Sequence, residues 1–126
     1  MNSDDLAIRE LVGDWLSIPE AAVRLGVRDR DVRSMISDQA LLAVRLDDRA
    51  PQIPAAFLVA DPVTGAVTVL AGLRGTVIQL ADAGYSDTEM VRWLFQPNDE
   101  LADTPVQALI NLRTHAVRRA GQALAF

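Results

Sequence analysis

The chain has 126 residues, of which 50% are hydrophobic, and carries 12 basic against 17 acidic residues for a formal net charge of −5. It has no cysteine, which excludes disulfide frameworks, thiolate nucleophiles and cysteine zinc sites. This length and composition predict one ordinary packed domain, or two small modules that share a core. The acidic N-terminal stretch and the absence of a long apolar run predict a cytoplasmic protein without signal peptide or membrane span.

The charge is unevenly distributed along the chain. Residues 1–103 hold nine arginines and all seventeen acidic residues, whereas residues 104–126 hold three arginines and no acid. Between residues 17 and 49, six arginines balance six acidic residues. A negative net charge argues against indiscriminate nucleic-acid binding. Any contact with DNA therefore has to come from arginines gathered on one face, with an affinity that depends on salt.

The first predicted element is a helix over Leu6–Trp15, preceded by a short tail of residues 1–5. Apolar residues at positions 8, 11, 12, 15 and 16 recur at helical spacing. We expect this helix to pack against the elements that follow.

The segment Ser17–Ser37 has the pattern of a helix-turn-helix. Ser17 and Glu20 form the S-x-x-E capping box that begins a helix. Gly26 supplies the backbone conformation that ends this helix and turns the chain. The second helix is predicted to begin near Asp29, where the helix dipole favours a negative charge. Its buried stripe, at i, i+3 and i+4 spacing, consists of Val32, Met35 and Ile36.

The free face of this second helix carries side chains suited to DNA. At about 100° per residue, the face opposite the buried stripe holds Arg30, Arg33, Ser34 and Ser37, with Arg28 at the entrance. Arginine can bind guanine through two hydrogen bonds or contact a phosphate, and serine can bond to either. We interpret these five residues as candidate DNA contacts. The alternative is a solvated face of a helical hairpin that binds nothing.

A small antiparallel sheet is predicted next. One strand is expected over residues 41–46 and a second over residues 53–59, joined by a turn at residues 47–51. Pro54 suggests an edge or a bulge in the second strand. After a turn at residues 61–65, a third strand over residues 66–70 is expected to pair with residues 57–60.

A helix-turn-helix followed by a hairpin is a winged helix. The hairpin tip would hold Arg45 and Arg49 beside the DNA backbone. Asp47 and Asp48 adjoin them and favour the alternative of a solvated turn. Both interpretations remain open at this point.

The remaining sequence has a helical pattern. Helices are expected over residues 73–84, 87–96, 106–112 and 115–124. Ser86 and Glu89 form a second capping box, and Thr104 precedes Pro105 at the start of the third of these helices. The predicted fold is mainly α with a small antiparallel β-sheet. Residues 1–72 form an N-terminal helix and winged helix-turn-helix, and residues 73–126 a helical module packed on it.

The sequence lacks the motifs of common catalytic and nucleotide-binding sites. It contains no G-x-x-x-x-G-K, G-x-G-x-x-G or G-x-S-x-G motif. His115 is the only histidine, and Arg113 and Arg118 nearby disfavour a bound cation. We therefore predict no metal site, no cofactor and no enzymatic activity.

Several short blocks carry a family resemblance. They are Leu42–Arg45, Ile53-Pro54, Phe57, Gly84-Tyr85, Asp87–Glu89, Arg92–Phe95, Pro97 and Ala116–Ala120. On these blocks the chain resembles the small actinobacterial winged-helix DNA-binding proteins first described in mycobacteria as a Ser/Thr-kinase substrate. The resemblance implies double-stranded DNA binding through the winged helix and a C-terminal helical module. We interpret the chain as a non-enzymatic regulator that acts on transcription or at the level of the nucleoid.

The same resemblance implies a Ser/Thr protein kinase as a possible partner. The family's phosphoacceptor lies in a longer N-terminal tail that contains threonine, whereas the tail of this chain offers Ser3. A phosphate at Ser3 would add a charge of about −2 and weaken DNA binding by repulsion.

The second half of the chain allows a different function. Its pattern is similar to the toxin-binding module of certain antitoxins, and the residues concerned are Trp93, Leu94, Pro97, Asn98, Leu101, Thr104, Pro105 and Leu109. On this alternative the C-terminal module binds a protein partner and DNA binding serves autoregulation. A third possibility is an interaction scaffold that binds no DNA.

Overall fold

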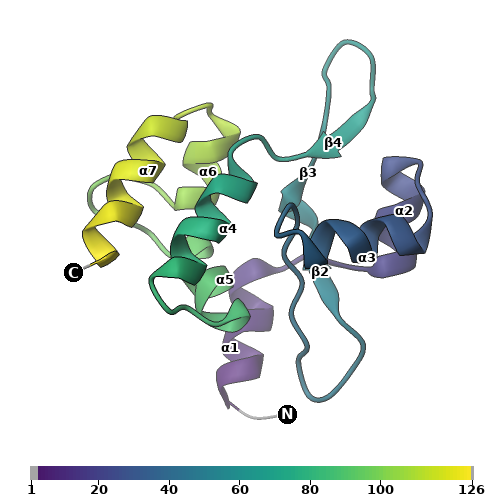
Figure 1. The fold of residues 1–126 in the computed structure, drawn as a ribbon, viewed down its shortest axis with the longest axis horizontal. Helices are drawn as coiled ribbons and strands as arrows, with labels where there is room; N and C mark the ends of the chain where they lie inside the picture. The colour runs from purple at the N-terminus through teal and green to yellow at the C-terminus, as the bar shows by residue number, and fades with distance from the viewer. Residues whose placement is uncertain (1–2, 126) are drawn as a thin grey trace.

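The computed structural model describes residues 3–125 and has a winged helix-turn-helix followed by a helical module (Figure 1). The N-terminal elements are α1 Ser3–Val12, β1 Trp15–Ser17, α2 Ile18–Leu25, α3 Asp29–Ser37, β2 Gln52–Pro54, the 3-10 helix η1 Ala55–Phe57, β3 Leu58–Ala60 and β4 Val67–Val69. The C-terminal elements are α4 Leu73–Asp82, α5 Asp87–Phe95, α6 Pro105–Ile110, α7 Thr114–Gln122 and the 3-10 helix η2 Ala123–Ala125. Residues 1 and 2 of the predicted tail lie outside the described residues.

The first helix begins and ends three residues earlier than predicted. Helix α1 ends at Val12 because Gly13, with φ of 84°, turns the chain while its N–H bonds to the carbonyl of Arg9. Trp15, the last residue of the predicted helix, lies instead in β1 together with Leu16. The prediction failed because the apolar spacing of these residues is equally compatible with a short strand, and β1 gains a distant partner in β2.

The predicted helix-turn-helix is confirmed. The Ser17 hydroxyl accepts a hydrogen bond from the N–H of Glu20, and the Glu20 carboxylate accepts one from the N–H of Ser17. Gly26 adopts the left-handed conformation, with φ of 70°, between α2 and α3. Val32 is fully buried, whereas Met35 and Ile36 are half-buried at the edge of the core.

The wing differs from the predicted hairpin. Residues 41–46 do not form a strand, since only Val44 makes a bridge, exchanging both backbone hydrogen bonds with Gln52 at 2.9 Å. Most of this segment is buried, so it crosses the core instead of lining a sheet. Strand β2 pairs antiparallel with β1, with Ser17 opposite Gln52. Gln52 thus lies between Val44 and Ser17, and residues 45–51 form a loop that we call the wing loop.

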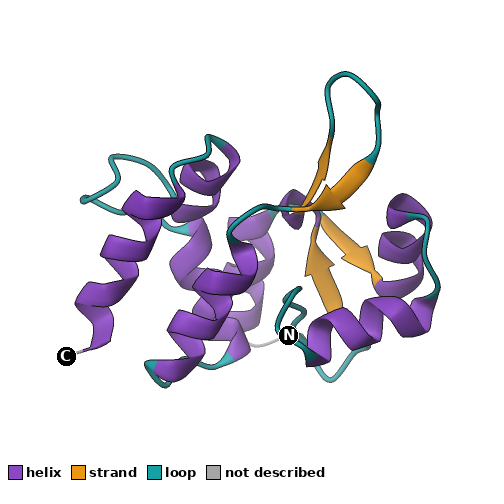
Figure 2. Cartoon of the chain, turned by 45° about the horizontal axis from the view of Figure 1, so that its top comes forward, coloured by secondary structure: helices purple, strands orange, loops and turns teal. Residues whose placement is uncertain are grey.

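The predicted second strand, over residues 53–59, is broken in two. Strand β2 ends at Pro54, and one turn of 3-10 helix separates it from β3. The predicted pairing of the third strand is confirmed, because β3 and β4 are antiparallel with Leu58 opposite Val69. At the tip of this hairpin, Asp61 accepts hydrogen bonds from the N–H groups of Val63 and Thr64 at 2.8 and 2.9 Å. Figure 2 shows the β3–β4 hairpin extending away from the helices.

The four predicted C-terminal helices are present. Ser86 and Glu89 exchange the expected capping hydrogen bonds at the start of α5, and the Thr104 hydroxyl caps α6. These helices lie on one side of the two small sheets, and α2 and α3 lie on the other (Figures 1 and 2). Helix α1 lies between the C-terminal helices and the α2–α3 pair, and it packs against α5 (Figure 1).

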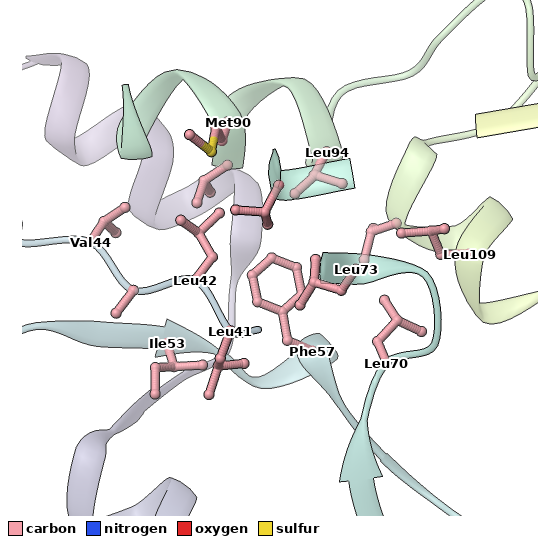
Figure 3. Close-up of a cluster of buried hydrophobic side chains, with 14 of the residues drawn as sticks. Leu41, Leu42, Val44, Ile53, Phe57, Leu70, Leu73, Met90, Leu94 and Leu109 are labelled. Atoms are coloured by element: carbon pink, nitrogen blue, oxygen red, sulfur yellow. The ribbon is translucent and has the colours of Figure 1, made fainter. Parts of the chain in front are cut away.

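A single hydrophobic core joins the two halves. Figure 3 shows Leu42 and Phe57, from the winged helix, among Leu73, Met90 and Leu94 from the C-terminal helices. All five side chains are buried. The helical module is therefore packed directly on the winged helix, which fixes its position relative to α3.

Candidate nucleic-acid interface

Helix α3 is held in place by its buried side and by its N-terminus. Val32 anchors the helix in the core. The carboxylate of Asp31 accepts a hydrogen bond of 3.0 Å from the backbone N–H of Arg28, which precedes the helix. These contacts leave the opposite side of α3 free for a ligand.

All five candidate residues of this helix are exposed, and they are Arg28, Arg30, Arg33, Ser34 and Ser37. Arg30, Ser34 and Ser37 follow each other at i, i+4 and i+7, and Arg33 lies three residues from Arg30 on the neighbouring row. The side chains of Arg30 and Arg33 make no hydrogen bond or ion pair with another residue of the described part of the chain. Their guanidinium groups are therefore available to bind phosphates or bases.

The wing loop holds Arg45 at its start and Arg49 near its middle. Both side chains are exposed, and Nη1 of Arg45 donates a hydrogen bond of 3.4 Å to the carbonyl of Arg49. Asp47 and Asp48 between them have left-handed φ angles of 56° and 58°. The N–H of Asp47 donates to the carboxylate of Asp5 at 3.0 Å, so α1 braces the wing loop. No motif in the sequence predicts this contact, which spans 42 residues.

The wing loop and α3 meet at a common cavity. Arg33 from α3 and Arg45 from the wing loop line a cavity of about 450 Å³. Ser86 and Thr88, from the start of α5, line the same cavity. The structure thus brings together two of the candidate arginines with hydroxyl groups that sequence reasoning did not connect with them. Arg28, at the other end of α3, does not line this cavity.

The remaining sequence predictions concern a phosphorylation site, the single histidine, metal binding and membrane spans. Ser3, the predicted phosphoacceptor, is exposed in the first turn of α1. His115 is exposed on α7. Within residues 3–125, no three or more His, Asp or Glu side chains are grouped so that they could hold a metal ion. Over the same range, every helix is too short or too polar to cross a membrane.

Two family models match the chain in succession. The model described as the winged helix-turn-helix domain of DNA-binding protein Rv2175c matches residues 4–58, and the model described as the Rv2175c C-terminal domain of unknown function matches residues 63–125. DNA-binding protein Rv2175c of Mycobacterium tuberculosis (strain ATCC 25618 / H37Rv) is 33% identical over 121 residues, which cover 86% of this chain and 79% of that protein. An NMR structure of Rv2175c aligns with a TM-score of 0.71 and 32% identity, over 90% of this chain and 82% of that one.

Proposed function

The chain belongs to the Rv2175c family of winged helix-turn-helix proteins, and we propose that it binds double-stranded DNA through α3 and the wing loop. The observation that carries the proposal is the free face of α3. The side chains of Arg30 and Arg33 have no hydrogen-bond or ion-pair partner in the described part of the chain, and Ser34 lies beside them. In a helix-turn-helix, the second helix is the one that enters the major groove.

Each group of candidate residues has its own role in this proposal. Arg30 and Arg33 contact base edges or phosphates from within the groove, and Ser34 and Ser37 add hydrogen bonds. Arg28, Arg45 and Arg49 contact the phosphate backbone on either side. Because the whole chain has a net charge of −5, the affinity rests on this local cluster and falls as salt is added.

The finer part of the proposal is that the protein regulates transcription. Arginine and serine on an exposed recognition helix are side chains that can discriminate base pairs, which a regulator has to do. Genomic fragments bound by the protein should then concentrate upstream of particular genes and share a motif. A uniform distribution over the genome would indicate binding without sequence preference.

The direct test is fluorescence anisotropy of a labelled duplex at about 50 and 200 mM salt. The Arg30→Ala/Arg33→Ala variant should lose about 1–3 kcal/mol of binding free energy for each base contact removed. For each arginine that contacts a phosphate, the slope of log affinity against log salt should fall by about 1. The matched control is Arg118→Ala/Arg119→Ala, which removes the same charge from exposed positions on α7, at the opposite end of the molecule (Figure 1).

Two results would contradict the proposal. Absence of binding at low salt would show that α3 does not read DNA, and the C-terminal module would then become the candidate for binding a protein partner. Equal loss in the two double variants would show that binding depends on overall charge and not on α3.

A further inference from the structure

The cavity between α3, the wing loop and α5 has the features of a small-molecule site. Its volume of about 450 Å³ lies within the range of about 300–1,000 Å³ that is typical of ligand pockets. It is formed where the winged helix meets the C-terminal module. Neither half of the chain could form it alone.

Half of the residues that line the cavity are apolar. Ile18, Ala43 and Val44 are almost fully buried, and Ile36 and Pro51 are half-buried. An apolar ligand body would remove their remaining exposed surface from water, which is favourable. A polar ligand would gain nothing from these walls.

The polar groups of the cavity converge on it from two sides. Arg33 and Arg45 contribute two positive charges from α3 and the wing loop, and Asp87 contributes one negative charge from α5. The Ser86 oxygen accepts the capping bond from the N–H of Glu89, and the Ser86 side chain also lines the cavity. The net charge of the lining is positive, and both cations come from elements other than α5.

We propose that this cavity binds a small amphipathic organic anion, whose apolar body packs on Ile18, Ile36 and Val44 and whose carboxylate or phosphate group pairs with Arg33 and Arg45. A charge-assisted hydrogen bond to arginine is about twice as strong as a neutral one, so the anionic group orients the ligand. The backbone of DNA is a poorer fit, because a sugar-phosphate chain offers no apolar body for these walls.

Occupation of the cavity has a consequence for DNA binding, and this part rests on the proposed function. Arg33 belongs both to the free face of α3 and to the cavity. An anion bound to Arg33 neutralises a charge that DNA requires, so the two ligands compete. By thermodynamic linkage, each lowers the affinity for the other by the same factor.

The test uses 2-naphthoate as the anionic probe and 2-naphthalenemethanol as its neutral analogue, added to the full chain without DNA. Amide resonances in ¹H–¹⁵N spectra report where each probe binds. Naphthoate should shift the resonances of Ile36, Val44 and Thr88 saturably, with a dissociation constant of about 1 mM or tighter. The Arg33→Gln/Arg45→Gln variant should bind naphthoate about tenfold more weakly.

The control variant is Arg118→Gln/Arg119→Gln, which should bind naphthoate as the unaltered chain does. Failure of naphthoate to saturate, equal binding of the neutral analogue or unchanged binding by Arg33→Gln/Arg45→Gln would overturn the proposal. The proposal would also be overturned if the amide resonances of Ser86 and Thr88 shifted on addition of a duplex but not on addition of naphthoate. The cavity would then belong to the DNA-binding surface.

A second titration separates this inference from the proposed function. Saturating naphthoate should weaken duplex binding by the unaltered chain, and unchanged duplex affinity would overturn the competition. If the chain binds no duplex even without naphthoate, the proposed function fails. The titration without DNA would still decide whether the cavity binds anions.

Discussion

The rings of Phe57 and Phe95 lie 5.7 Å apart between centroids, with their planes inclined by 46°. Phe57 follows β2 in the winged helix, and Phe95 ends α5 in the C-terminal module. Phe57 is completely buried, and Leu73 and Leu94 lie beside it in the shared core (Figure 3). The contact therefore couples the stability of the two halves.

We predict that Phe57→Ala lowers the free energy of unfolding by about 3–5 kcal/mol and destabilises both halves together. The two tryptophans provide separate probes, because Trp15 lies in β1 and Trp93 in α5. Urea unfolding of Trp15→Phe and Trp93→Phe proteins, followed by fluorescence, should give coincident transitions before and after the Phe57 change. Separate transitions would show that residues 1–72 and 73–126 fold independently.

The turn between α2 and α3 depends on a glycine. Gly26 has φ of 70°, and a Cβ atom added there would meet no atom within 4 Å. Gly26→Ala should therefore cost only the conformational strain of about 1–2 kcal/mol. Gly75, within α4, has equally open surroundings without a positive φ, so Gly75→Ala should stabilise the protein by about 0.5–1 kcal/mol. Chemical denaturation of the two variants would contradict this account if both changes had the same sign.

The capping boxes make stability depend on pH. The backbone N–H and hydroxyl of Ser86 lower the pKa of Glu89 below its ordinary value of 4.5, and Ser17 lowers the pKa of Glu20 in the same way. A carboxylate whose pKa is lowered by folding stabilises the protein above the unfolded-state pKa. This stabilisation is lost as the pH falls through the folded-state pKa.

We expect Glu89→Gln to reduce the loss of stability between neutral pH and pH 3, because the glutamine side chain does not titrate. Urea unfolding measured from pH 7 to pH 3 would test this. Glu20→Gln should act in the same direction at α2, since its hydrogen bonds are equivalent. An unchanged pH dependence in both variants would contradict the role assigned to these carboxylates.

The acidic residues of the wing loop should oppose DNA binding. Asp48 is exposed, and its left-handed φ is one that asparagine also tolerates. Asp48→Asn therefore removes a charge without disturbing the loop. It should raise DNA affinity about threefold at low salt, with a smaller gain as salt screens the charges.

The control for this change is Asp99→Asn, an exposed position in the connection between α5 and α6. It alters the net charge equally but lies away from the wing loop. Anisotropy titrations that gave the same gain for both variants would show that net charge, and not the wing loop, governs affinity.

Sequence reasoning was most successful where the interaction is local. Ser17 and Glu20, or Ser86 and Glu89, are three residues apart, so the bond that begins each helix can be recognised from the residues themselves. The outward direction of Arg30 and Arg33 follows in the same way from helical periodicity and a buried Val32. The candidate DNA-binding face could therefore be predicted residue by residue.

The wing was predicted less well, because strand pairing is chosen among distant partners. Residues 41–46 are apolar enough for a strand. All three residues of β2 pair with β1, however, and the 41–46 segment makes only one bridge to β2, between Val44 and Gln52. The helix prediction for Trp15 fails for the same reason, since nothing near Trp15 in the sequence indicates that it pairs with Pro54, 39 residues away.

Local order was thus contained in the amino-acid sequence: helix starts, the glycine turn, the β3–β4 hairpin and the face of α3 that carries arginine. The arrangement of distant segments emerged only in the folded chain. The cavity between Arg33, Arg45 and Thr88 belongs to this second class, as does the contact of Asp5 with the wing loop. Short-range hydrogen bonds and periodicity depend on a few neighbouring residues, whereas such contacts depend on how the whole core packs.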